Sequence, residues 1–337
     1  MHYWPLDFYR FFAAFTVTSS HFFLTLNSSP TAEFISILGV ELFFVLSGFV
    51  LTPHLLKVQD SPSQNIKIFL IRRWLRTIPP YIIALTCAAI LFGYGDLFNF
   101  VKFLSYTQNL VSDSPKVNFF PVAWSLSVEE WFYILTPLLI LCLSRIYKNK
   151  NNLLVIGLSI IVIINLARLG MNDGLNWGED VRRSVLLRGD AIFFGVIAYL
   201  LLHQIKTWLL IYLSLFSLIF LFIIGINPNL LSTSVAIQNL FLPIASLFFS
   251  SIILLITFIN LESKLIKKIA KFSADISYSM YLFHLFFIYF FINFSNKIFV
   301  SFLVYNSALI FFCYLFFIFF EKPILEKRRN FKYILKE

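Results

Sequence analysis

The sequence predicts an all-α polytopic membrane protein with about ten membrane-spanning helices. Of its 337 residues, 59% are hydrophobic and 13% are charged, and the mean hydropathy is +0.82. Soluble domains have about 45–50% apolar and about 25% charged residues. Apolar runs of about 20 residues, long enough to cross a hydrocarbon core of about 30 Å, recur along the whole chain. We therefore expect one membrane domain over residues 1–337, without an attached soluble domain, as a multi-pass protein of the cell (inner) membrane.

Interruptions between the apolar runs divide the chain into its expected helices. Short polar sequences such as Asn-Ser-Ser-Pro at 27–30 mark turns. The longest expected breaks between helices are 57–76, 95–122 and 170–186. The ten expected helices cover residues 5–27, 34–56, 77–94, 123–145, 152–169, 187–203, 208–225, 236–260, 274–294 and 298–320.

The distribution of lysine and arginine predicts that both termini are cytoplasmic. Cytoplasmic loops of membrane proteins carry an excess of these residues. With the N-terminus inside, most of the 27 Lys and Arg residues fall in inner segments. Arg182, Arg183 and Arg188 form an exception on the outer side. This cluster is either an anion-binding site or a solvated loop.

The basic charge and the cysteines indicate neither a nucleic-acid partner nor a metal site. The formal net charge of +10 is spread over short segments between apolar runs, where it sets topology. Cys87, Cys142 and Cys313 lie singly inside apolar runs, without disulfide or metal-ligand spacing. We therefore expect no metal and no tightly bound cofactor.

The first expected helix contains two ionisable residues, Arg10 and His21. Burying a charge at the centre of a membrane helix costs about 2.5–3.5 kcal/mol, so such residues usually face the bundle interior and mark function. A spacing of eleven residues places both on one helix face, about 16 Å apart. Alternatively, Arg10 extends to the cytoplasmic interface and His21 bonds a neighbouring helix.

The chemistry of this pair suits a long donor molecule. A neutral imidazole is a general base at physiological pH. An arginine three turns away can hold a phosphate in a charge-assisted contact. Coenzyme A thioesters have phosphates at one end and a reactive acyl group at the other, which matches this separation.

Seven short motifs follow one another along the chain from residue 6 to residue 323. They are Leu6-Asp7 with Arg10, Ala13, Val17 and His21; Gly39 to Phe49, including Glu41 and Ser47; Arg72-Arg73 with Arg76, Pro79 and Tyr81; Trp124-Ser125-Leu126 with Glu129, Phe132 and Tyr133; Arg188 with Asp190, Gly195 and Ala198; Ser277-Tyr278 with Tyr281-Leu282 and His284; and Glu321-Lys322-Pro323. In this order they resemble the acyltransferase family 3 membrane proteins, whose opening motif is R-x10-H.

The resemblance implies an acyl-CoA-dependent O-acyltransferase, with acetyl-CoA as the usual donor and cosubstrate. The acceptor would be a hydroxyl of a cell-surface or lipid-linked polysaccharide, such as O-antigen or exopolysaccharide. Membrane lipids, acyl-CoA and this glycan would be the partners. His21 would act as the catalytic base and Arg10 would hold the cytoplasmic part of coenzyme A.

The resemblance also implies roles for residues beyond the first helix. Besides His21, Glu129 and Glu321 would be catalytic, whereas a solvated helix-start acid and an ion pair with Lys322 are the alternatives. Arg72, Arg73 and Arg76 would bind the donor, or only set topology. The residues expected to line a cavity or bind the acceptor are Glu41, Ser47, Trp124, Ser125, Arg188, Asp190, Tyr278, Tyr281 and His284, the last with packing as its alternative.

Two other classes of protein compete with the enzyme. Arg10, His21, Glu129 and Glu321 would serve a proton-coupled transporter as a proton or substrate path. However, the paired broken helices of many transporters are not evident in the sequence. A glycan-export accessory protein would not depend on His21. A Gly-x-Ser-x-Gly elbow is also missing, which argues against a serine acyl-enzyme.

Overall fold

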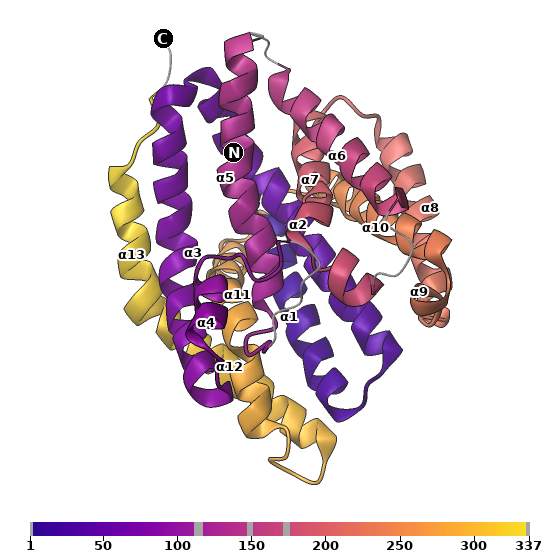
Figure 1. Cartoon of the computed structure of the whole chain (residues 1–337), viewed down its shortest axis with the longest axis vertical. Coiled ribbons are helices and arrows are strands. Elements are labelled where there is room, and N and C mark those ends of the chain that lie inside the picture. Colours follow the sequence, from indigo (N-terminus) through magenta and orange to yellow (C-terminus); the bar gives the residue numbers. More distant parts are fainter. Residues whose placement is uncertain (1–2, 111–116, 147–150, 171–175, 335–337) are drawn as a thin grey trace.

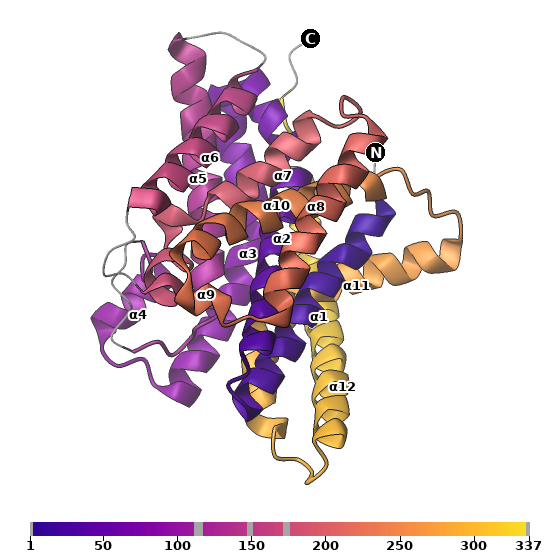
Figure 2. The same cartoon turned by 90° about the vertical axis from the view of Figure 1, so that its right-hand side faces the viewer.

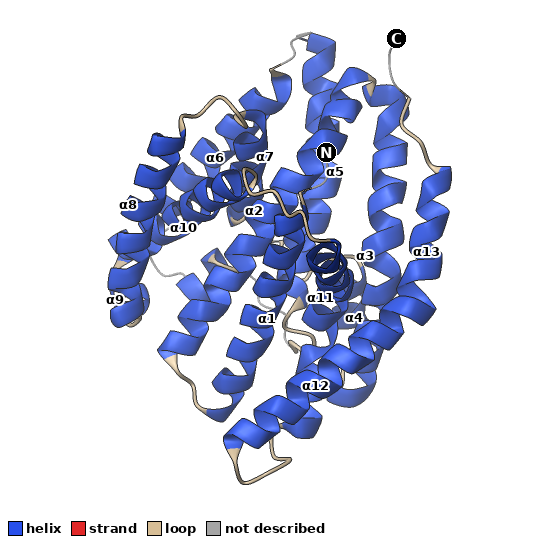
Figure 3. Ribbon diagram, turned by 180° about the vertical axis from the view of Figure 1, so that it is seen from behind, coloured by secondary structure: helices blue, strands red, loops and turns tan. Residues whose placement is uncertain are grey.

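The described residues form a bundle of α-helices with short π and 3-10 turns. A computed structural model describes residues 3–110, 117–146, 151–170 and 176–334, and no strand occurs among them. Helices α3 and α5 run roughly along the long axis of the molecule, and α1 lies near its centre (Figures 1 and 3). The expected all-α class is confirmed.

Eight helical segments of the described chain are long and apolar enough to cross a membrane. They are α2 (Pro30–Asp60), α3 (Pro62–Phe92), α5 (Ala123–Ile146), α6 (Asn152–Gly170), α8 (Thr207–Ile226), α10 (Val235–Ile256), α11 (Lys264–Phe291) and the stretch Ile298–Asn330, which comprises α12 (Ile298–Phe316), η3 (Phe317–Glu321), α13 (Lys322–Lys327) and η4 (Arg328–Asn330). The other elements are α1 (Trp4–Leu26), α4 (Leu97–Leu104), η1 (Trp177–Val181), η2 (Val185–Leu187), α7 (Asp190–Leu200) and α9 (Leu230–Thr233).

Two expected boundaries between helices are wrong. The expected break at 57–76 is helical, because α2 continues to Asp60 and α3 begins at Pro62 after Ser61 alone. Proline is well tolerated at the first position of a helix, where its missing N–H would have no intrahelical partner. The helix expected to begin at 274 begins ten residues earlier, and its exposed first turns project from the bundle (Figure 2). Apolar runs mark only the part of a helix that is buried in lipid or protein.

The other two long breaks contain short elements. Within 95–122, the side chain of Asp96 caps α4 by accepting a 2.7 Å hydrogen bond from the N–H of Asn99. Within 170–186, the side chain of Asn176 caps the π turn η1 by accepting from the N–H groups of Gly178 and Glu179. Helix α7 spans Asp190–Leu200 and is shorter than the helix expected at 187–203.

Helix α1 lies between α2 and α11 and packs extensively against both. Its 23 residues are about 34 Å long, enough to cross a hydrocarbon core. Polar residues lower its mean hydropathy, so it is not one of the eight apolar segments. Ala13, Ala14 and Val17 are fully buried on its inner face. The beginning of α1 and the chain that follows η4 both lie in the upper half of the molecule (Figure 1).

A pair of glycines allows α2 and α7 to approach closely. A Cβ atom added at Gly48 of α2 would overlap the carbonyl oxygen of Ile192 in α7. A Cβ atom added at Gly195 of α7 would likewise overlap the carbonyl oxygen of Val45 in α2. Small residues let the backbones of membrane helices pack closely and gain dispersion energy.

We expect Gly195→Ala to lower the free energy of unfolding by about 1–3 kcal/mol, because the added methyl group must push the two backbones apart. Thermal unfolding of the purified protein in detergent, followed by tryptophan fluorescence, measures this loss. Gly170→Ala is the matched control, since an added Cβ there meets no atom of the described residues within 4 Å. Equal unfolding temperatures for the two variants would contradict the close approach.

Candidate active site

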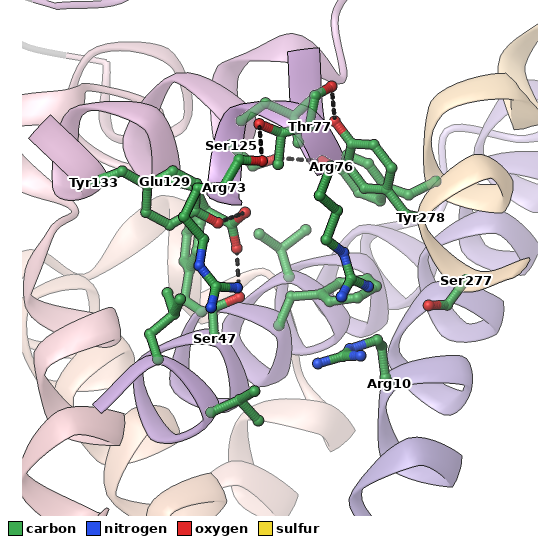
Figure 4. Close-up of a pocket in the computed structure, with 17 residues that line it drawn as sticks. Arg10, Ser47, Arg73, Arg76, Thr77, Ser125, Glu129, Tyr133, Ser277 and Tyr278 are labelled. Carbon is green, nitrogen blue, oxygen red and sulfur yellow. Dashed lines mark hydrogen bonds between the residues drawn. The ribbon is translucent and has the colours of Figure 1, made fainter. Parts of the chain in front are cut away.

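Three arginines line a cavity next to the N-terminal half of α1. Arg10 comes from α1, and Arg73 and Arg76 come from α3 (Figure 4). No hydrogen bond or ion pair joins the guanidinium group of any of them to a described residue, and the Nε of Arg73 is buried without a partner. We call this the arginine cavity. Guanidinium groups that have no ion-pair partner in the protein suit a ligand that brings negative charge.

Glu129 of α5 is an acid within the same cavity. It accepts a 2.6 Å hydrogen bond from Ser47 of α2 and a 3.0 Å hydrogen bond from Tyr133 one turn further along α5. Both partners also line the arginine cavity. None of its described hydrogen bonds reaches His21, so Glu129 is placed with the arginines and not with the expected base.

The arginine cavity extends toward the chain ends. This extension shares Arg10, Arg73 and Arg76 and adds Arg328 of η4, together with His54 of α2. Arg328 thus belongs to the cavity wall although it lies far along the chain from the other arginines.

Arg72 faces away from this cavity and holds the C-terminal segment in place. Its Nη1 donates hydrogen bonds to the carbonyl oxygens of Arg328 (3.0 Å) and Phe331 (2.6 Å). Asn65 adds two hydrogen bonds to Ile334. Its side-chain nitrogen donates to the backbone carbonyl oxygen, and its side-chain oxygen accepts from the backbone N–H. The Arg72 guanidinium also lies over the ring of Tyr333, at 5.5 Å. Of the three arginines expected to bind the donor, Arg73 and Arg76 therefore line the cavity, whereas Arg72 bonds the C-terminal segment.

His21 lines a second cavity near the C-terminal end of α1, which we call the histidine cavity. Its Nδ1 lies 2.7 Å from Nε2 of His284 in α11. Its Nε2 lies 3.0 Å from the hydroxyl of Ser36 in α2. Trp124 of α5 also contributes to the wall. The ring of His21 is therefore held between the two helices that enclose α1.

The two cavities share Tyr281 of α11 and Val40 of α2 in their walls. The Tyr281 hydroxyl contacts the hydroxyl of Ser125, which lines the arginine cavity, and donates to the carbonyl oxygen of Val122 at 3.2 Å. Arg10 and His21, both on α1, consequently lie in adjacent cavities that meet at one tyrosine.

Arg182 and Arg183 line the histidine cavity, so two of the three clustered outer arginines reach the candidate site. Each has an acidic partner. Arg182 pairs with Glu33 at 3.1 Å, and Arg183 pairs with Glu179 at 2.5 Å. Burial, and to a smaller extent the neighbouring Arg183, lowers the pKa of Arg182 to about 9. Arg182 therefore remains cationic at neutral pH.

Three residues expected to line a cavity instead form buried ion pairs between helices. Arg188 donates to Glu41 of α2 at 2.5 Å, and Ser246 of α10 donates to the same carboxylate. Asp190 pairs with Arg168 of α6. Arg188 and Glu41 have no exposed side-chain surface. Because removing one partner would leave an uncompensated buried charge, each pair ties its helices together.

The remaining expected site residues do not share one cavity. Tyr278 and His284 belong to α11, and Glu321 of η3 contacts that helix. Glu321 is buried and accepts a hydrogen bond from Ser279, and no described ion pair joins it to Lys322. Tyr278 lines the arginine cavity and donates to the carbonyl oxygen of Thr77 at 2.9 Å. His284 is fully buried against His21.

Ser36 and Arg328 are the site residues that the sequence interpretation missed. Arg328 is one of the basic residues that served only to predict topology, and Ser36 belongs to none of the seven motifs. Only the structure identifies them as site residues, through the contact of Ser36 with His21 and the position of Arg328 in the cavity wall. Among the described residues, no group of three or more His, Cys, Asp and Glu side chains could hold a metal ion.

A family model described as an acyltransferase domain matches residues 4–320. The peptidoglycan O-acetyltransferase OatA of Listeria monocytogenes is 30% identical over 184 residues, which cover 47% of this chain and 29% of that protein. The O-acetyltransferase OatA of Staphylococcus aureus is 29% identical over 182 residues, covering 47% of this chain and 30% of that protein. The matched regions thus span less than a third of these relatives, and no solved structure matches. Because the family model covers nearly the whole chain, the protein belongs to this acyltransferase family and is a multi-pass membrane enzyme.

Proposed function

We propose that the protein is an acetyl-CoA-dependent O-acetyltransferase that acts on a cell-surface or lipid-linked polysaccharide. The observation that carries this proposal is the pair of cavities that meet at Tyr281. One contains arginines that have no described ion-pair partner, and the other contains a histidine. Family membership favours this enzyme over the transporter and the accessory protein.

The arginine cavity suits the phosphate-bearing end of the donor. Arg10, Arg73, Arg76 and Arg328 would bind the phosphates of coenzyme A through charge-assisted hydrogen bonds. The thioester would then lie near Tyr281 and Ser125, at the boundary with the histidine cavity. The positive-inside rule, with both termini cytoplasmic, would place the phosphates on the cytoplasmic side, where coenzyme A is available.

The reaction then needs one base and one proton donor, and His21 serves as both. Its Nε2 removes the proton from the acceptor hydroxyl while the hydroxyl oxygen attacks the carbonyl carbon of the thioester. The C–S bond breaks, the new ester stays on the acceptor, and the coenzyme A thiolate takes the proton from His21. The Tyr281 hydroxyl lies at the boundary of the two cavities, and by turning its proton from the carbonyl oxygen of Val122 it would donate a hydrogen bond to the developing oxyanion.

The histidine cavity would hold the acceptor, on the side of the membrane opposite to the chain ends. Its wall combines Trp124 and Ser36 with the Arg182–Glu33 ion pair, which offers both donors and acceptors to sugar hydroxyls. The name of the Listeria monocytogenes relative makes peptidoglycan the first acceptor to test, beside O-antigen and exopolysaccharide.

We expect His21→Ala to reduce acetyl transfer by about 10²–10⁴-fold, the usual contribution of a general acid–base group, without impairing membrane insertion. The measurement is the base-labile acetate of surface glycan from a knockout strain complemented with each variant. His203→Asn is the matched control, because His203 is exposed and lines neither cavity, and its positive φ of 67° suits asparagine. Full O-acetylation by His21→Ala would exclude His21 as the base.

We expect Arg10→Ala and Arg328→Ala each to raise the KM for acetyl-CoA by about tenfold or more, because each removes a hydrogen bond to a charged group. The maximal rate should return at high donor concentration. Acetyl-CoA turnover by purified protein measures both quantities. The exposed Arg145→Ala, at the end of α5, is the control for simple loss of positive charge. A loss that no donor concentration restores would contradict a phosphate-binding role.

We expect Arg72→Ala to act through the C-terminal segment, since Arg72 bonds the carbonyls of Arg328 and Phe331. The segment should be cleaved faster by trypsin, and the KM for acetyl-CoA should rise less than in Arg328→Ala. Limited proteolysis followed by mass spectrometry detects the first effect. Unchanged cleavage with a KM increase equal to that of Arg328→Ala would instead assign Arg72 to direct donor binding.

A further inference from the structure

His284 is fully buried in α11 and makes two hydrogen-bond contacts through its ring nitrogens. Its Nδ1 lies 2.8 Å from the carbonyl oxygen of Tyr281, and its Nε2 lies 2.7 Å from Nδ1 of His21. The centroids of the two imidazole rings lie 4.9 Å apart, and the ring planes are inclined to each other by 28°. The position of His284 is therefore determined by its own helix on one side and by His21 on the other.

These contacts determine which nitrogens carry protons when both rings are neutral. A carbonyl oxygen only accepts, so Nδ1 of His284 must be the protonated nitrogen. Nε2 of His284 is then an acceptor, and the 2.7 Å contact requires a proton on Nδ1 of His21. Nε2 of His21 is left with a free lone pair, directed at the Ser36 hydroxyl in the histidine cavity.

We propose that His284 is a positioning residue that holds His21 in the tautomer and orientation in which Nε2 is the base. This inference rests on the proposed acetyl transfer. Without His284, nothing among the described contacts of His21 would favour a proton on Nδ1, and the ring would be free to present a protonated, non-basic Nε2 to the acceptor.

His284 also stabilises the imidazolium that forms during transfer. Once Nε2 of His21 has accepted a proton, the Nδ1–H···Nε2 hydrogen bond to His284 becomes charge-assisted and stronger. In serine hydrolases a buried aspartate holds the catalytic histidine in this way. Here the partner is an imidazole, so no further negative charge has to be buried beside the base.

The test compares His284→Leu with His284→Gln in the purified full-length protein, using acetyl-CoA and soluble glycan strands prepared from peptidoglycan. Leucine fills the space without an acceptor, whereas the glutamine carbonyl can accept from Nδ1–H of His21. Tyr305→Phe is the control. It removes a different buried hydrogen bond to α1, from the Tyr305 hydroxyl to the carbonyl oxygen of Thr18 at 3.1 Å.

We expect His284→Leu to lower the turnover number at least about 100-fold while the KM for acetyl-CoA is unchanged. His284→Gln should recover most of this loss, and Tyr305→Phe should turn over as the wild type. Equal turnover in His284→Leu and the wild type would overturn the inference while leaving the acetyltransferase intact. A wild type that acetylates none of the peptidoglycan, O-antigen and exopolysaccharide acceptors would instead reject the proposed function.

A second readout does not depend on activity. The chain has five histidines, so 15N NMR of histidine-labelled protein, with His21→Ala for assignment, can identify the protonated nitrogen of His21. The expected state is a protonated Nδ1 and an unprotonated Nε2 in the wild type and in His284→Gln, with loss of this preference in His284→Leu. The opposite tautomer in the wild type would overturn the inference.

Discussion

The enclosure of α1 between α2 and α11 is the constraint on which the rest of the site depends. A membrane helix that carries an arginine and a histidine cannot turn these side chains toward lipid without a large free-energy cost. With neighbours on both sides, α1 instead directs Arg10 into the arginine cavity and His21 into the histidine cavity. The partners of each group then come from the enclosing helices, with Ser36 on α2 and His284 on α11.

The buried ionisable groups divide according to whether the protein supplies their counter-charge. Two arginines have their counter-charge within the protein and connect helices: Arg188 pairs with Glu41, and Arg168 pairs with Asp190. The guanidinium groups of the arginine cavity have no described ion-pair partner. Breaking a buried pair destabilises a protein strongly, whereas an unpaired charge at a cavity wall remains available to a ligand. This difference distinguishes arginines that connect helices from arginines that line a cavity without an ion-pair partner, within motifs that look alike in the sequence.

Composition and helix periodicity were sufficient to predict the all-α class and the common face of Arg10 and His21. Both depend on local properties, namely the length of apolar runs and the 3.6-residue repeat. The continuity of α2 and α3 through 57–76 was not predictable from hydropathy, because helices that leave the membrane become polar without ending. The contact between His21 and His284 joins residues 263 positions apart. The placement of Arg328 depends on a hydrogen bond that the Arg72 side chain donates to its backbone carbonyl oxygen. Such long-range contacts leave no periodic signal in a single sequence.

The separation between the arginines and His21 gives the proposed site a way to select its donor. Eleven helical residues correspond to about 16 Å along α1, and Tyr281 lies between the two cavities. A small acyl phosphate held by the arginines would leave its carbonyl carbon far from Nε2 of His21. A donor whose phosphates and acyl group are joined by a long, uncharged arm can reach both ends at once. Binding energy gained at the arginines would thereby be used to place the thioester beside the base, which is the way in which remote contacts accelerate a reaction.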